Sequence, residues 1–134
     1  MKNNLVIIGA VGALTLVMLV AGMSKSRKSP MMKAAAKGDG RAIARFIKKG
    51  ANVNAANGLG GTALIYAAQA GQKAVVDYLL SKGADPNAIE GEAKKNTAGM
   101  TALMWAAQNG HAAIVKRLLE KGADLKVKTK LGQT

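Results

Sequence analysis

Residues 61–85 read GTALIYAAQAGQKAVVDYLLSKGAD, and residues 100–124 read MTALMWAAQNGHAAIVKRLLEKGAD. Three landmarks of these stretches recur at one constant offset along the chain: Thr62 with Thr101, Gly71 with Gly110, and Gly83 with Gly122. Self-similarity at a fixed period is typical of proteins that stack one structural unit several times. The chain is therefore predicted to be a stack of repeats, in which each unit buries its apolar face against its neighbours.

A weaker copy of the same unit lies upstream, from Ser29 to about residue 60. Its central Gly38 and its terminal Gly50 precede their counterparts, Gly71 and Gly83, by the same number of residues. This spacing is slightly shorter than the spacing between the second and third copies. Ser or Thr at the start of each copy is a good N-cap, Pro30 suits the first helical position, and the glycines stop helices. Two short helices are thus predicted in each copy, at 31–37 and 41–48, 63–70 and 73–81, and 102–109 and 112–120, with Gly38-Asp39-Gly40 as the break in the first copy. Helices this short do not persist alone in water, so stability is expected to come from stacking.

A period of about 33 residues with a T-x-L start, an Ala-Ala pair, a central Gly and a Gly-Ala-Asp/Asn end resembles the ankyrin repeat. The resemblance covers 29–134, about four-fifths of the chain. It implies an all-α fold, an ankyrin-repeat solenoid of helix-turn-helix units with β-hairpin fingers. One hydrophobic helix is expected to precede the solenoid, because of the uncharged residues 5–23. About three repeats are expected, at 29–60, 61–99 and 100–132. The T-P-L-H start of the family appears here as Thr62-Ala63-Leu64-Ile65, and its His, which in the family ties neighbouring repeats, is missing from every copy. We therefore expect an array less stable than a consensus one.

Two places depart from a regular array. Repeats two and three are separated by six extra residues, which fall in the finger near 90–95 (EGEAKK). Such an insertion either belongs to a binding face or is a tolerated surface loop. At the other end, Gly132-Gln133-Thr134 aligns with Gly60-Gly61-Thr62, the start of a further repeat. Three explanations are open for the outer face of repeat three. Its own polar residues Lys116 and Arg117 make it compatible with water, another chain covers it, or the sequence is a truncated product.

The N-terminal region 1–24 is predicted to be a membrane anchor or a signal segment. Residues 5–23 (LVIIGAVGALTLVMLVAGM) carry no charge over 19 positions, close to the roughly 20 apolar residues that a spanning helix needs. A basic linker follows at 25–28, and the flank richer in Lys and Arg tends to remain in the cytoplasm. We therefore expect a single-pass membrane protein with cytoplasmic repeats. The alternatives are a reversed anchor or a signal cleaved near Val20-Ala21-Gly22, either of which would leave the repeats outside the cytoplasm, exported or periplasmic.

Few residues are available for chemistry. The chain has no Cys, one His (His111) and seven carboxylates, an inventory too thin for most catalytic constellations. No motif pairs His111 with a nucleophile or a second metal ligand, and Gly58-Leu59-Gly60-Gly61 lacks the Lys-Ser/Thr of a phosphate-binding loop. We predict that the protein is not an enzyme, has no catalytic or metal-binding residues and uses no cofactor.

The resemblance to ankyrin repeats also implies where a partner binds. In this family, recognition uses the finger tips and the ends of the first helices, which line a concave surface. A further variable position precedes the Gly-Ala-Asp turn, and an aromatic residue follows the position of the missing His. The residues predicted to contact a partner are Leu59, Gly61, Tyr66, Gln69, Lys82, Thr97, Met100, Trp105, Gln108 and Asn109. Tyr66 and Trp105 are equivalent positions, and they are either packed framework residues or aromatic binding anchors.

Two functions are compatible with these features. The first is a non-enzymatic protein–protein interaction module displayed at a membrane, which binds a partner with an acidic surface through its concave face and fingers. The formal net charge is +13, and six basic residues lie in repeat one: Lys33, Lys37, Arg41, Arg45, Lys48 and Lys49. The alternative is therefore electrostatic binding of nucleic acid or anionic lipid through the basic first repeat and the linker. Nucleic acid is the less favoured partner, because no interleaved set of aromatic residues is present for base stacking. The sequence makes no prediction of oligomeric state.

Overall fold

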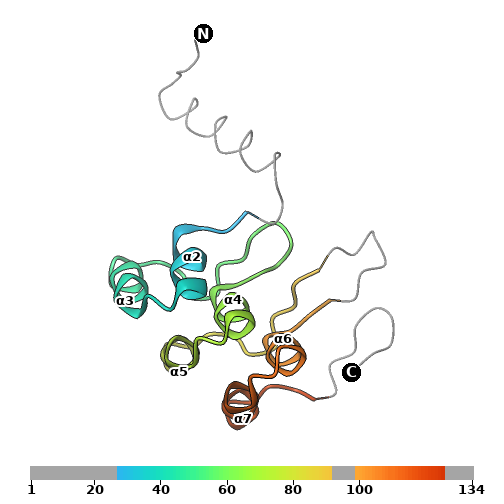
Figure 1. The fold of residues 1–134 in the computed structure, drawn as a ribbon. Coiled ribbons are helices and arrows are strands. Elements are labelled where there is room, and N and C mark those ends of the chain that lie inside the picture. The colour runs from blue at the N-terminus through green and yellow to red at the C-terminus, as the bar shows by residue number, and fades with distance from the viewer. Residues whose placement is uncertain (1–26, 92–98, 126–134) are drawn as a thin grey trace.

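The structure is a computed structural model, and it describes residues 27–91 and 99–125. These residues form six α-helices in three consecutive pairs (Figure 1). The pairs are α2 (Pro30–Lys37) with α3 (Gly40–Lys48), α4 (Ala63–Ala70) with α5 (Lys73–Ser81), and α6 (Ala102–Gln108) with α7 (Ala112–Glu120). The predicted all-α stack of helix-turn-helix units is confirmed for this part of the chain.

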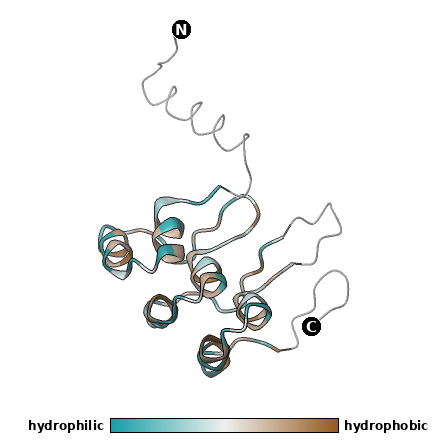
Figure 2. Ribbon diagram, viewed as in Figure 1, coloured by the Kyte–Doolittle hydropathy of each residue, from teal (hydrophilic) through white to brown (hydrophobic). Residues whose placement is uncertain are grey.

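The helices lie in two rows (Figure 1). The first helices of the pairs, α2, α4 and α6, pack side by side, and α3, α5 and α7 form a second row behind them. The core lies between the rows, and its largest fully buried side chains are Met32, Ile43, Leu64, Ile65, Val76, Leu79, Ile114 and Leu118. Figure 2 shows hydrophobic and hydrophilic residues sharing the circumference of α3 and α7, as expected of helices with one face on a core and one in water.

The central helix α4 is enclosed by neighbours. Six consecutive residues, from Ala63 to Ala68, are buried, because α4 packs against α2 on one side, α6 on the other and α5 behind. Three of the six are alanines, whose small side chains let neighbouring helices approach closely. The Ala-Ala pair that marks the repeat in the sequence is therefore a packing feature.

The predicted N-caps are confirmed. Ser29 Oγ accepts a hydrogen bond from Met32 N at 3.2 Å, and Thr62 Oγ1 accepts one from Ile65 N at 3.3 Å. Thr101 caps α6 in the same way, with a distance of 3.2 Å to Met104 N. Each hydroxyl satisfies one of the backbone donors that the first turn of a helix leaves without a partner.

Three predicted helix boundaries differ from the structure. α3 starts at Gly40 rather than at residue 41, because Asp39 Oδ1 accepts a hydrogen bond from Ala42 N at 3.1 Å and caps the helix. Gly38, with φ +81°, and the cap residue Asp39 separate the two helices, so the predicted three-residue break is one residue too long. α2 also begins one residue early, at Pro30, and α6 ends one residue early, at Gln108.

The fingers project from the ends of the first row of helices (Figure 1). In the first finger, Asn57 Oδ1 accepts hydrogen bonds from Leu59 N at 3.0 Å and Gly61 N at 2.9 Å, which closes a tight turn. In the described part of the second finger, Glu90 and Met100 form an antiparallel bridge and exchange backbone hydrogen bonds of 2.9 and 2.7 Å. Among the residues that the structure describes, the predicted hairpins thus correspond to this bridge in the second finger and to a turn in the first.

Several sequence predictions concern residues outside the described ranges. They are the hydrophobic helix within 1–24, residues 25 and 26 of the linker, residues 92–95 of the insertion, and the start of a further repeat within 126–134. Within 27–91 and 99–125, no helix has the length and apolar character needed to cross a membrane.

Candidate partner-binding surface

Tyr66 joins both fingers and the linker at the centre of the predicted binding face. Its side chain comes from α4 and is 4% exposed. Its hydroxyl accepts a hydrogen bond from Asn57 Nδ2 of the first finger at 2.7 Å and donates one to Glu90 Oε2 of the second finger. The ammonium of Lys28, the last linker residue, lies 4.8 Å from the centre of the ring. Tyr66 therefore has a framework role, which was one of the two alternatives left by the sequence.

This environment raises the pKa of Tyr66 from 10.0 to about 12. Burial of the hydroxyl is the largest cause, and the hydrogen bond to the Glu90 carboxylate is the second. The hydrogen bond from Asn57 acts in the opposite direction, because an amide donor favours the tyrosinate. Tyr66 is thus held neutral, as a donor to Glu90.

Titration of Tyr66 tests this network. The chain has two tyrosines, so a Tyr78→Phe variant leaves Tyr66 as the sole tyrosinate signal in ultraviolet absorbance. We expect a native midpoint near pH 12 and an unfolded midpoint in urea near 10. Because the native pKa is the higher one, the contribution of Tyr66 to stability is complete below pH 10 and is lost as the pH rises from 10 to 12. Adding Glu90→Gln should lower the native midpoint. A native midpoint close to 10 in the Tyr78→Phe protein would contradict the assigned contacts.

The two fingers pack directly against each other. Gly91 N donates a hydrogen bond to Leu59 O at 2.9 Å. At Gly60, which has φ +87°, an added Cβ would lie 2.5 Å from the backbone oxygen of Ile89. At Gly61, an added Cβ would lie 2.5 Å from both the Glu90 carboxylate and the Tyr66 hydroxyl. Gly61 was predicted to contact a partner, and in the structure it is buried and allows this close approach.

Asparagines at the bases of the fingers tie consecutive repeats together. Asn54 Nδ2 donates to Gly83 O at 3.1 Å, and Asn54 Oδ1 accepts from Asp85 N at 2.7 Å. Asn87, the equivalent residue of the next repeat, makes the same two bonds to Gly122 O at 3.2 Å and from Asp124 N at 2.8 Å. Each side chain therefore fixes the spacing between its own repeat and the next.

A second series of ties lies where the second helices begin. Gln72 Nε2 donates to Ala36 O of the preceding repeat at 3.1 Å, and His111 Nε2 lies 3.3 Å from Gln69 O. Asn109 Nδ2 also donates to Gln69 O, at 2.9 Å. These contacts give His111 a framework role and supply polar ties between repeats at positions other than that of the missing family histidine.

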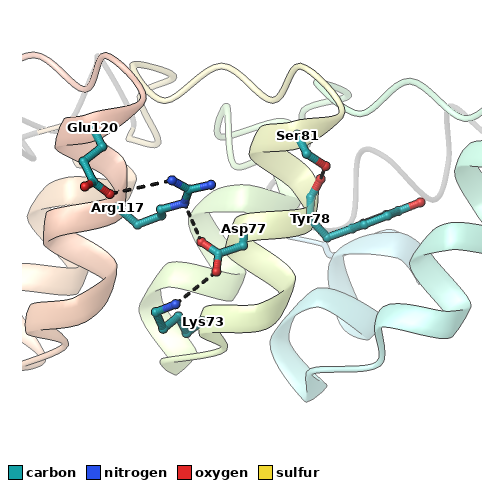
Figure 3. Close-up of polar contacts among 6 residues, drawn as sticks. All are labelled: Lys73, Asp77, Tyr78, Ser81, Arg117 and Glu120. Atoms are coloured by element: carbon teal, nitrogen blue, oxygen red, sulfur yellow. Dashed lines mark hydrogen bonds and ion pairs between the residues drawn. The ribbon is translucent and has the colours of Figure 1, made fainter.

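A charged cluster ties repeats two and three on the outer row (Figure 3). Asp77 of α5 lies 2.9 Å from Arg117 Nε of α7 and 3.0 Å from Lys73 Nζ of its own helix. Arg117 Nη1 also lies 3.7 Å from the Glu120 carboxylate. Partial burial works against ionisation of Asp77, but the hydrogen bonds from Lys73 and Arg117 outweigh it and lower the pKa of Asp77 below its ordinary 3.8. Arg117 was predicted to be a polar residue that covers the outer face of repeat three. In the structure it also binds Asp77 of the preceding repeat.

Asp77→Asn is expected to reduce the acid sensitivity of the protein. The native pKa is lowered, so the contribution of Asp77 is complete above about pH 4 and is lost as the pH falls through the native value. Its magnitude is expected to be below about 1 kcal/mol, because these side chains are about one-third exposed or more and solvent screens their charges. Urea denaturation at neutral and acidic pH measures the difference. An identical pH dependence in the wild type and in Asp77→Asn would contradict the proposed pairing.

The structure places the predicted partner-binding residues in three environments. Gly61 and Tyr66 are buried, whereas Leu59, Gln69, Met100 and Trp105 are half-buried, and Lys82, Gln108 and Asn109 are exposed. Thr97 lies outside the described residues. Lys82 follows the outer helix α5, and its ammonium lies 5.6 Å from the centre of the Tyr78 ring, so its contact is with the second row. The other six accessible residues lie on the first-row helices, at their ends, or on the fingers.

Trp105 differs from its equivalent Tyr66. It is only partly buried, yet its indole Nε1 is enclosed, and no described residue accepts a hydrogen bond from it.

In the ranges that the structure covers, no group of three or more His, Cys, Asp or Glu side chains is placed to hold a metal ion. The six accessible residues offer aliphatic, amide, thioether and aromatic side chains.

Comparison with known proteins places the chain in a family. The family description "Ankyrin repeats (3 copies)" matches residues 8–90, and "Ankyrin repeat" matches residues 98–130. The matched region thus amounts to about four repeats over 8–130, where the sequence predicted about three.

Curated relatives share parts of this region. Mitochondrial disaggregase from Bos taurus is 41% identical over 80 residues, which are 58% of this chain and 12% of that protein. The Homo sapiens disaggregase is 38% identical over 78 residues, 56% of this chain and 11% of its own length. Inactive serine/threonine-protein kinase TEX14 from Bos taurus is 51% identical over 45 residues, 34% of this chain and 3% of that protein. The chain therefore spans at most 12% of the length of these relatives, and it belongs to the ankyrin-repeat family.

Proposed function

We propose that the protein is a non-enzymatic protein-binding module that is displayed at a membrane. The observation that carries the binding assignment is the set of accessible side chains on the first-row helices, at their ends and on the fingers: Leu59, Gln69, Met100, Trp105, Gln108 and Asn109. We call this set the concave set. Ankyrin repeats point to a protein partner, and the positive net charge favours an acidic surface on it.

Contacts between the described parts of the two fingers favour binding. The first finger is held to the second by the Asn57–Tyr66–Glu90 contacts and by the bond from Gly91 N to Leu59 O. Association loses affinity when flexible loops must be ordered on binding. Fingers that are fixed before the partner arrives avoid much of that cost.

The membrane part of the proposal rests on residues 5–23. Thr15 is the one polar side chain among these 19 residues. A surface helix of a solenoid needs a polar face, whereas a helix that is apolar all round belongs in a buried or lipid environment. The family match begins at residue 8, so an additional repeat is the competing assignment for this segment. We favour an uncleaved anchor, because the stretch is longer than the roughly 7–15 apolar residues of a signal core. Its basic C-terminal flank predicts cytoplasmic repeats.

Partner capture from solubilised membranes tests the binding face. Gln108→Glu adds a negative charge to an exposed residue at the end of α6, and Ala74→Glu adds the same charge to an exposed position of the outer helix α5. Because a negative charge repels an acidic surface, we expect Gln108→Glu to lose a partner that both the wild type and Ala74→Glu retain. If both variants retained the partner equally, the binding site would lie outside the concave set.

Alkaline extraction and protease protection test the membrane assignment. We expect the protein to stay in the membrane fraction at alkaline pH, and the repeats to be digested only after the cytoplasm is opened. Release at alkaline pH would support an additional repeat in place of an anchor. Digestion from outside sealed cells would reverse the orientation.

A further inference from the structure

The positive charge of the described residues is concentrated at one end of the stack. Residues 27–61 hold eight Lys or Arg and a single acid, Asp39. Residues 62–91 and 99–125 together hold five basic and five acidic residues, and so balance to zero. A protein whose charge served only solubility would be expected to mix the two signs along the whole stack. The imbalance therefore marks repeat one as a distinct surface.

We call the exposed basic residues of repeat one the basic face: Lys33, Lys37, Arg41, Arg45, Lys48 and Lys49. Arg41, Arg45 and Lys48 follow the spacing that places residues on one side of a helix, and they form a stripe along α3. Lys33 and Lys37 lie one turn apart on the adjoining α2. The opposite side of α3 carries Ala42 and Ile43, which are buried in the core. The stripe is thus the solvent side of an amphipathic helix.

None of the basic face is neutralised by an acid within 27–91 and 99–125. The ion pairs there join Lys73 and Arg117 to Asp77, and Arg117 to Glu120, all in repeats two and three. Asp39, the one acid near the basic face, accepts the capping hydrogen bond from Ala42 N. The basic face is therefore free to bind an anionic surface.

The chain enters the repeats at the start of α2, the helix that carries Lys33 and Lys37 of the basic face. Lys28 is held against the Tyr66 ring, which fixes where the linker meets the fold. Six peptide steps separate Met23 from Ser29, and at about 3.3–3.6 Å per residue they reach no further than about 20 Å. If residues 5–23 span a bilayer, α2 and α3 are tethered close to its headgroups. The anionic lipids of the cytoplasmic leaflet attract basic residues at such distances.

We propose that the basic face docks on anionic lipid headgroups of the membrane that holds residues 5–23. This inference rests on the proposed membrane anchor. It specifies which end of the stack meets the lipid and leaves the concave set to the protein partner. Nucleic acid fits less well, because the one aromatic residue of repeat one, Phe46, is partly buried and packs against the core, where bases cannot stack on it.

Fluorescent probes at single cysteines test the docking in the full-length chain, which has no cysteine of its own. Ala44→Cys places a probe within the stripe of α3, Ala51→Cys places one just beyond α3, and Ala113→Cys places one on α7 at the far end. The proteins are reconstituted into phosphatidylcholine vesicles with or without phosphatidylserine, each carrying a headgroup-attached quencher. We expect quenching at 44 and 51 in the anionic vesicles only, and at 113 in neither. Salt near 1 M should release the basic face from the vesicles and abolish the quenching, since the electrostatic screening length falls to about 3 Å.

Charge reversals identify the residues responsible. Each basic residue near an anionic surface strengthens docking about fivefold, so Arg41→Glu/Arg45→Glu should weaken it by at least about 25-fold. Lys116→Glu/Lys121→Glu makes the same change in net charge on exposed positions of repeat three and should leave docking intact. Circular dichroism confirms that both variants keep the helical fold. Equal loss in both variants would contradict a specific basic face.

The outcomes separate this inference from the anchor on which it rests. Extraction of the protein from both kinds of vesicle at alkaline pH would overturn the anchor. A protein that resists extraction but shows no quenching at 44 or 51 would overturn the docking alone. Displacement of the probes from anionic vesicles by short duplex DNA, at an equal concentration of phosphate charge, would reassign the basic face to nucleic acid.

Discussion

Leu79→Ala is expected to lower the free energy of unfolding by about 2–5 kcal/mol, through lost burial and the cavity that remains. Leu79 is 0% exposed and lies on α5, in the middle repeat. Its cavity would open in the core that α5 shares with α4, and α5 also packs against both α3 and α7. The loss should therefore destabilise the whole stack, since each repeat is stabilised by its neighbours.

Leu119→Ala is the matched control. Leu119 belongs to the outer helix of repeat three and is 37% exposed, so the same truncation should change stability by less than about 0.5–1 kcal/mol. Chemical denaturation followed by circular dichroism measures both. Equal losses in the two variants would contradict the placement of the core between the two rows.

Gly60→Ala is expected to separate the two fingers as well as to destabilise the protein. At φ +87°, a residue with a Cβ costs roughly 1–2 kcal/mol. The new Cβ would also lie 2.5 Å from Ile89 O. This is a backbone atom, so a side-chain rotation cannot relieve the contact, and such overpacking adds about 1–3 kcal/mol to the loss of stability. The combined loss should approach that of a core truncation, and the bond from Gly91 N to Leu59 O should break.

Gly83→Ala separates the two costs. Gly83 has φ +90°, almost the same backbone conformation, but nothing lies within 4 Å of the position of its Cβ. Gly83→Ala should therefore lose only the roughly 1–2 kcal/mol that the positive φ costs a residue with a Cβ. Hydrogen exchange at Gly91 N reports the finger contact, and it should accelerate in Gly60→Ala while remaining slow in Gly83→Ala. The same exchange rate in both variants would show that the fingers do not depend on this approach.

The sequence predicted the helices well because local signals agree with the packing. Thr62 and Thr101 are both N-caps and markers of the repeat, and they are buried at the start of their helices. The boundary at Gly40 was misplaced for a physical reason. Glycine was interpreted as a helix breaker, but the Asp39 cap stabilises the first turn of α3 strongly enough to include it.

The candidate site was only partly predictable. Family positions identified the exposed Gln108 and Asn109, but they could not distinguish Tyr66 from Trp105. The difference depends on Asn57 and Glu90, which contribute their side chains from two different fingers. Contacts between side chains so far apart in the chain have no local signature.

The ties between repeats had a signal that sequence reasoning missed. Asn54 and Asn87 keep the same offset that relates Gly38 to Gly71 in repeats one and two. Two asparagines at equivalent positions can be found in the sequence by extending the alignment past the Gly-Ala-Asp/Asn turn. Asparagine is common in turns, so its presence after a helix does not by itself indicate a contact between repeats.

Site-specific photo-cross-linking in intact membranes tests the central claim most directly. A photoreactive amino acid is placed at Leu59 or Gln108, in the concave set, and at Ala74, which is exposed on the outer helix α5. A discrete covalent adduct with another protein from Leu59 and Gln108, and none from Ala74, is the predicted result. Adducts from Ala74 with none from the concave set would contradict a partner-binding surface on this face.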